Sequence, residues 1–190
     1  MANVDRPDGF RPVGTLSGGS MTGQVQKFLA NEALFLGDLV TKSGTGRSSG
    51  DGAYQDCARA GAGNAILGVV VGWEIDPDNL SAVHCAASTT KAVFVNTDPN
   101  LTLECQSDDG TPVVADVGQN FNIVVASGST TSGASNMELD GDTGATTAAL
   151  PLKLIGFTDT PDNDTGSANM SCLVTINNHI HKGHTGTDGV

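Results

Sequence analysis

Short apolar segments separated by turn-forming residues recur along most of the chain, and each is of strand length. Residues 101–106 (LTLECQ) show the pattern most plainly, because Leu101, Leu103 and Cys105 alternate with polar residues. A period of two is typical of a strand with one buried face. The other segments that we expect to form strands are residues 33–41, 66–75, 91–96, 121–126, 150–154 and 170–176.

Turn and loop signals separate these segments. Residues 76–79 (DPDN) and 108–110 (DDG) predict tight turns, the second of the hairpin type. Residues 43–52 and 127–135 predict flexible loops. Residues 22–32 have some helical character, but they are poorly capped and carry a glycine near their start. We therefore predict an all-β fold of eight to ten strands, an antiparallel β-sandwich or barrel with an extended N-terminal arm.

The chain is expected to have three parts. Residues 1–23 form the arm, since they are rich in glycine, contain two prolines and show little periodicity. Residues 24–178 form a β-rich body, and residues 179–190 form a polar C-terminal tail. The apolar residues within the arm are typical of a segment that packs on a partner. The partner-binding residues that we predict within the arm are Phe10, Arg11, Pro12 and Val13.

Charge and composition narrow the range of partners. The formal net charge of −12 repels phosphates and anionic lipid headgroups, so we expect neither nucleic acid nor a membrane as a partner. The sequence has no apolar run of membrane-spanning length and no signal peptide at its start, which favours synthesis and retention in the cytoplasm. The 25 glycines among 190 residues fit a fold with many turns.

Motifs for catalysis and cofactor binding are weak. Residues 61–66 (GAGNAI) begin like a dinucleotide-binding loop, but they lack the third glycine and lead into a predicted strand instead of a helix. The four cysteines form no CxxC pair, and we expect them to be reduced and structural. We therefore predict a protein that is not an enzyme, with no catalytic residues and no cofactor.

Two groups of residues could in principle bind a metal ion. His179, His181 and His184 form an H-x-H-x₂-H pattern, in which the first two would share one face of a strand. A solvated C-terminal segment, or a ring of histidines about a symmetry axis, explains the same pattern. The DGD at residues 140–142 and the DND at residues 162–164 resemble fragments of calcium loops, although both equally suit turns. We predict no metal site.

Several segments, in their order along the chain, resemble a family of tailed-phage structural proteins. Residues 1–13 (MANVDRPDGFRPV) are similar to the opening of that family. Residues 33–40 (ALFLGDLV) and 66–70 (ILGVV) are similar to two of its internal segments. Residues 96–100 (NTDPN), 137–140 (MELD) and 176–179 (INNH) also fit the family pattern.

The resemblance implies a role that composition alone does not show. It implies a head-decoration (cement) protein, made in the host cytoplasm, that binds the outer surface of the assembled major capsid protein shell. It also implies self-association, most simply as a homotrimer at the three-fold positions of the shell. The alternatives are a minor tail or neck protein and a glycan-binding protein of the virion surface.

Overall fold

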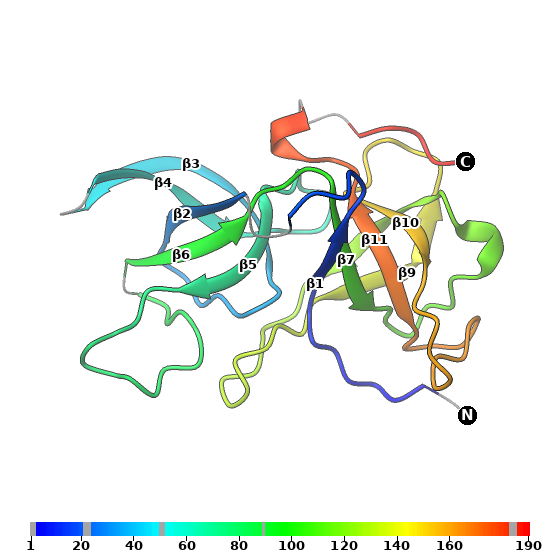
Figure 1. Cartoon of the computed structure of the whole chain (residues 1–190), viewed down its shortest axis with the longest axis horizontal. Helices are drawn as coiled ribbons and strands as arrows, with labels where there is room; N and C mark the ends of the chain where they lie inside the picture. Colours follow the sequence, from blue (N-terminus) through cyan, green and yellow to red (C-terminus); the bar gives the residue numbers. More distant parts are fainter. Residues whose placement is uncertain (1–2, 21–23, 50–51, 89, 183–185) are drawn as a thin grey trace.

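The computed structural model describes residues 3–20, 24–49, 52–88, 90–182 and 186–190. In this part of the chain the regular structure is β, apart from two single-turn 3-10 helices, η1 (Val114–Asp116) and η2 (Ile180–Lys182). Eleven strands form two sheets that lie side by side (Figure 1). The prediction of an all-β fold is confirmed.

The first sheet closes into a barrel of five strands in the order β2-β4-β3-β5-β6. Its neighbours are antiparallel except β2 and β4, which are parallel. A cluster of apolar side chains fills its interior, including Phe28, Val40, Val93 and Val95. The strand bounds are β2 (Val25–Ala30), β3 (Leu39–Ser49), β4 (Gly52–Arg59), β5 (Gly68–Trp73) and β6 (Lys91–Asn96).

The second sheet has six antiparallel strands in the order β1-β7-β11-β10-β8-β9. It curls, so that Ser107 after β7 meets Leu139 of β9 in an isolated bridge. The concave side holds the larger core cluster, which also takes in Leu39 and Val69 from the barrel. The strand bounds are β1 (Arg11–Thr15), β7 (Leu101–Gln106), β8 (Asn120–Val124), β9 (Glu138–Ala145), β10 (Leu152–Phe157) and β11 (Ser171–Ile176).

Strands with an apolar period were predicted well. β6 and β7 have the predicted bounds, and the side chains of β7 alternate between buried and half-buried positions as the sequence indicates. Near residues 108–110 the chain does turn, with the Asp108 side chain accepting the N–H of Gly110 at 3.0 Å. However, β7 pairs with β1 and β11 and not with the next strand, so the predicted hairpin is wrong.

Two segments differ from the sequence prediction. Residues 22–32, with some helical character, contain strand β2, all of whose residues pair with β6. Residues 43–52, predicted as a loop, belong largely to the β3–β4 hairpin. The hairpin was missed because beyond Lys42 its described side chains are mostly solvent-exposed, so the chain there has no apolar period.

The ends of the chain pack against the body. From Phe10 to Thr15, the segment expected to be an arm is integrated into the six-stranded sheet: β1 pairs with β7, and Phe10 is fully buried in the larger core cluster. At the other end, the Thr187 N–H donates to the Asn177 side chain at 2.9 Å. The N–H of Val190 donates to the carbonyl of Gly118 at 3.2 Å. Both ends therefore contribute to the folded body in the described residues.

Candidate functional site

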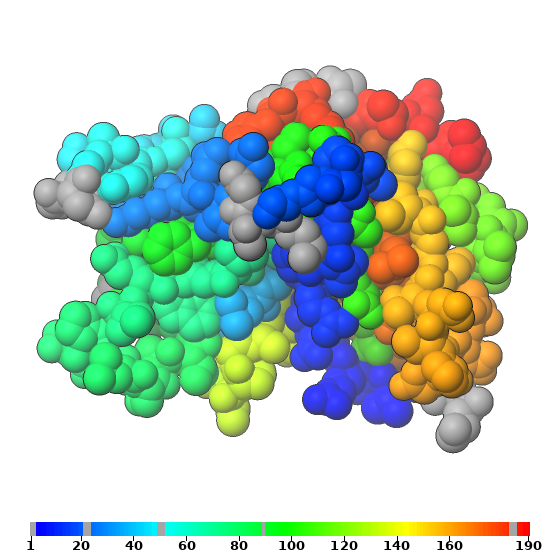
Figure 2. All heavy atoms as spheres, viewed as in Figure 1, coloured from blue at the N-terminus to red at the C-terminus, as the bar shows by residue number. Residues whose placement is uncertain are grey.

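Three segments singled out in the sequence meet where the two sheets adjoin: residues 7–13, 33–40 and 66–70. The N–H of Phe10 donates to the carbonyl of Gly37 at 2.9 Å, and the N–H of Gly37 donates to the carbonyl of Val70 at 3.0 Å. Figure 2 shows the N-terminal segment, in blue, lying between the barrel and the six-stranded sheet. Segments that are distant in sequence thus form one surface.

Two glycines make this close approach feasible. Gly9 and Gly37 have φ values of +71° and +85°, which strain any residue with a Cβ atom. A Cβ atom on Gly9 would lie 2.5 Å from the Cβ of Ser135 and 2.9 Å from the carbonyl oxygen of Gly37. Gly9 in residues 7–10 (PDGF) and Gly37 in residues 35–38 (FLGD) therefore have a structural role, because they let two backbone segments pack directly against each other.

The four predicted partner-binding residues fall into two groups. Phe10 is fully buried and Pro12 is partly buried, so both serve the packing of the junction itself. Arg11 and Val13 are exposed on β1, the edge strand of the six-stranded sheet. Of the four side chains, these two can reach a partner without any rearrangement.

An apolar groove lies on the barrel side of β1, and we call it the junction groove. Its volume is about 350 Å³. Leu36 and Val71, both in it, are 42% and 36% exposed, although large aliphatic side chains are usually buried. The residues that line it are Asp8, Phe10, Arg11, Pro12, Leu36, Gly37, Val70, Val71 and Ala134.

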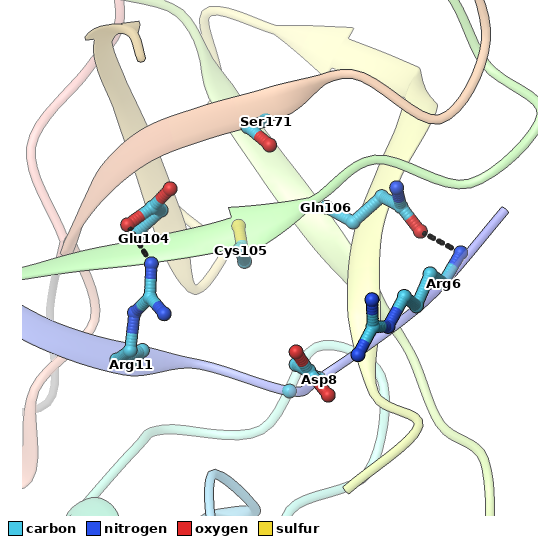
Figure 3. Close-up of a pocket in the computed structure, with 8 residues that line it drawn as sticks. Arg6, Asp8, Arg11, Glu104, Cys105, Gln106 and Ser171 are labelled. Carbon is cyan, nitrogen blue, oxygen red and sulfur yellow. Dashed lines mark hydrogen bonds and ion pairs between the residues drawn. The ribbon is translucent and has the colours of Figure 1, made fainter. Parts of the chain in front are cut away.

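A smaller, polar hollow of about 100 Å³ lies on the other side of the N-terminal segment (Figure 3). The Arg11 guanidinium forms an ion pair of 2.5 Å with Glu104 on β7, and this carboxylate raises the pKa of Arg11. The N–H of Arg6 donates to the Gln106 side chain at 2.8 Å. Through its Nε2 atom Gln106 donates in turn to the carbonyls of Val4 and Asn169. These bonds hold the segment against the sheet.

The hollow contains polar groups but no activated nucleophile among its lining residues. Cys105 is among its lining residues, yet its side chain belongs to the core cluster, and burial raises the pKa of its thiol well above the ordinary value. A thiol held in the protonated form is a poor nucleophile. The guanidinium, carboxylate and amide groups of the hollow can form hydrogen bonds and ion pairs with a ligand.

The two described members of the predicted histidine group differ in exposure, since His181 is exposed and His179 is not. His179 is fully buried, because the chain after β11 pairs with residue 66, with the N–H of Ile180 donating to the carbonyl of Ile66 at 2.9 Å. Burial, followed by the charge of His181, lowers the pKa of His179 to about 4. His184 lies outside the described residues. The described residues contain no cluster of three or more His, Cys, Asp or Glu side chains that could hold a metal ion.

The two acidic segments also have structural partners. Residues 140–142 belong to strand β9 instead of forming a turn, and the Gly141 N–H donates to the Asp108 carboxylate at 2.9 Å. In residues 162–164, the Asn163 side chain donates to the carbonyls of Thr158 and Ser171 and accepts from the N–H of Ser171. Asn163 therefore fixes its loop against the first residue of β11.

Sequence reasoning missed a loop that carries exposed apolar side chains. Residues 74–83 form the first part of the connection from β5 to β6, and Ile75 and Leu80 are 73% and 79% exposed. The sequence marked only the turn at residues 76–79, since periodicity does not tell which apolar residues a fold leaves uncovered. Leu36 and Val71 were missed for the same reason.

The described part of the chain contains no helix long and apolar enough to cross a lipid bilayer. No family model, curated protein or solved structure matches this chain. A function therefore has to follow from the surfaces of the molecule and from the sequence resemblance.

Proposed function

We propose that this chain is a decoration protein of a tailed-phage head. In this role it binds the outer surface of the assembled major capsid protein shell and stabilises it, most simply as a homotrimer made in the host cytoplasm. The proposal requires no catalysis and no cofactor. It rests first on the sequence resemblance in residues 1–13, 33–40 and 66–70.

The observation that carries the proposal is the convergence of these segments on one surface. The Phe10–Gly37 and Gly37–Val70 hydrogen bonds join them into one junction. The junction presents Arg11, Val13, Leu36 and Val71 to solvent. A mixed apolar and basic surface on a strongly acidic chain suits protein recognition, in which arginine and apolar anchors contribute much of the affinity.

The stabilising effect would come from mass action. A protein that binds the assembled shell but not the separated capsid subunits shifts the equilibrium toward the shell. Repeated sites on a closed surface let an oligomer bind through several subunits at once, which raises its avidity. The net charge of −12 keeps such a protein soluble at high local concentration and away from the packaged genome.

Binding of purified protein to expanded heads that lack it tests the proposal. Wild-type protein should cosediment with empty and DNA-filled heads equally, whereas Val13→Asp should bind much more weakly because it places a charge in the contact. Val114→Asp is the matched control, since Val114 is 70% exposed on η1, outside the three converging segments.

Two results would contradict the proposal. One is that the wild-type protein fails to bind heads, and the other is that binding requires packaged DNA. Two measurements distinguish the alternatives. A tail or neck protein would be present in few copies per virion. A glycan-binding protein would bind defined sugars on a glycan array.

A further inference from the structure

We propose that the junction groove receives the loop at residues 74–83 of a second copy of this chain. This inference deepens the proposed function by naming the surfaces through which subunits associate. The inference is tested in solution without any capsid, so its outcome is independent of whether the protein binds heads.

The loop has the character of a preformed anchor. Its first turn is held by the Asp76 carboxylate, which accepts the N–H of Asp78 at 3.1 Å and forms an ion pair of 2.6 Å with Lys91. The N–H of Ala82 donates to the carbonyl of Asn79 at 3.1 Å. Against this ordered backbone, the side chains of Ile75 and Leu80 stay exposed to water. A preordered loop loses less conformational entropy on binding than a flexible one does.

The junction groove has the complementary shape and polarity. It is concave, its volume is about 350 Å³, and its walls are apolar, with Phe10, Leu36 and Val71 among them. This volume accommodates a leucine side chain together with its neighbours. The lining of the groove includes no residue of the loop of the same chain, so within one molecule both surfaces remain uncovered.

Charge also distinguishes a second copy from an arbitrary apolar partner. The loop carries Glu74, Asp76 and Asp78, whereas the groove is bordered by Arg11, whose side chain is 66% exposed. Arg11 is one of nine lysines and arginines in a chain of net charge −12. Asp8 also lines the groove and Arg11 already pairs with Glu104 through one nitrogen, so the attraction comes only from the guanidinium N–H donors that this ion pair leaves available at one end. Docking the loop in one orientation therefore brings its acidic residues to the basic end.

The symmetry of such a contact limits which oligomers it can form. The loop and the groove are different surfaces, so each subunit would use its loop on one neighbour and its groove on the other. A heterologous contact of this kind generates a ring when the rotation closes. A two-fold dimer would use both surfaces reciprocally between the same two subunits, and three subunits give the smallest ring in which each subunit has two different neighbours, as in the trimer of the proposed function.

Analytical ultracentrifugation of the wild type and two variants tests the proposal. The wild type should form a closed oligomer at micromolar concentration. Leu80→Asp in the loop and Val71→Asp in the groove should each raise the dissociation constant by roughly a hundredfold or more, because each buries an unpaired charge. Both side chains are solvent-exposed, so thermal melts should show that the variants remain folded. Val114→Asp is the control and should leave the oligomer unchanged.

Mixing the two variants is the decisive measurement. Leu80→Asp retains an intact groove and Val71→Asp retains an intact loop, so an equimolar mixture of the two monomers should form a one-to-one heterodimer with one native contact. The proposal is overturned if the wild type is a monomer, if either variant associates like the wild type, or if the mixture forms no heterodimer.

Discussion

Glu138, the first residue of β9, has a carboxyl group that is unusually hard to ionise. Its Oε1 atom is buried without a hydrogen-bond partner in the described residues. Burial, followed by the nearby charges of Asp5, Asp108 and Asp109, raises the pKa of Glu138 to about 7. In the unfolded chain the same group has a pKa of about 4.3. Folding therefore favours the protonated form.

Stability should consequently fall as the pH rises through neutrality. The contribution of protonated Glu138 is fully present below about pH 4.3 and is lost as the pH passes the folded pKa of about 7. Glu138→Gln should raise the free energy of unfolding at pH 8 by about 1–2 kcal/mol, a value reduced for solvent screening, and change it little at pH 4.

Urea unfolding at the two pH values measures this difference. Glu74→Gln is the control, because Glu74 is exposed on the loop after β5 and should give the same small change at both values. Equal effects of Glu138→Gln at pH 4 and pH 8 would show that folding does not raise the pKa of Glu138.

At the scale of elements, β1 shows how a segment without periodicity becomes part of the fold. Phe10 precedes the strand and is fully buried in the core of the six-stranded sheet. Phe10→Ala should lower the free energy of unfolding by about 3–5 kcal/mol, because it leaves a cavity in a packed core. Val13→Ala on the same strand should cost about 0.5 kcal/mol or less, since Val13 is 39% exposed.

Urea unfolding of both variants, with the wild type as reference, measures the role of this segment. A detached arm would give small and similar effects for the two substitutions, whereas an integrated strand gives a large effect for Phe10 alone. Removal of residues 1–20 should likewise destabilise the body, because it deletes the strand as well as its anchor.

Sequence patterns could predict the strands that bury one face. They could not predict strands that form only because they pair with residues far away in the sequence. β6 and β7 were located from their apolar residues. β1 depends on pairing with β7, some ninety positions away, and the outer part of the β3–β4 hairpin has hardly any apolar residues to reveal it. Likewise, Arg11 and Val13 could be named from the sequence, whereas Leu36 and Val71 could not, because tertiary packing decides which apolar side chains stay exposed.

On the scale of the whole molecule, the two sheets share their packing. The larger core cluster contains Leu39 from β3, Val69 from β5 and Ile66 before it, beside the residues of the six-stranded sheet. The hydrogen bonds of Phe10 and Gly37 cross the same junction. Neither sheet can therefore unfold without exposing apolar surface of the other, and we expect a single cooperative transition.

The cysteines provide a probe for each sheet. All four are free and buried: Cys57 and Cys85 lie in the core of the barrel, and Cys105 and Cys172 lie opposite each other on β7 and β11. Burial raises the pKa of Cys57 and of Cys172 to about 12, so native thiols should react slowly with alkylating reagents.

Pulsed alkylation in increasing urea, followed by mass spectrometry of the peptides, tests the cooperativity directly. All four thiols should become reactive at one urea concentration, and the denatured, non-reduced protein should contain four free thiols. Labelling of Cys57 and Cys85 at a lower urea concentration than Cys105 and Cys172 would mean that the barrel unfolds separately. In that case the junction could not act as a rigid surface, because its groove walls belong to both sheets and would move apart when either one opened.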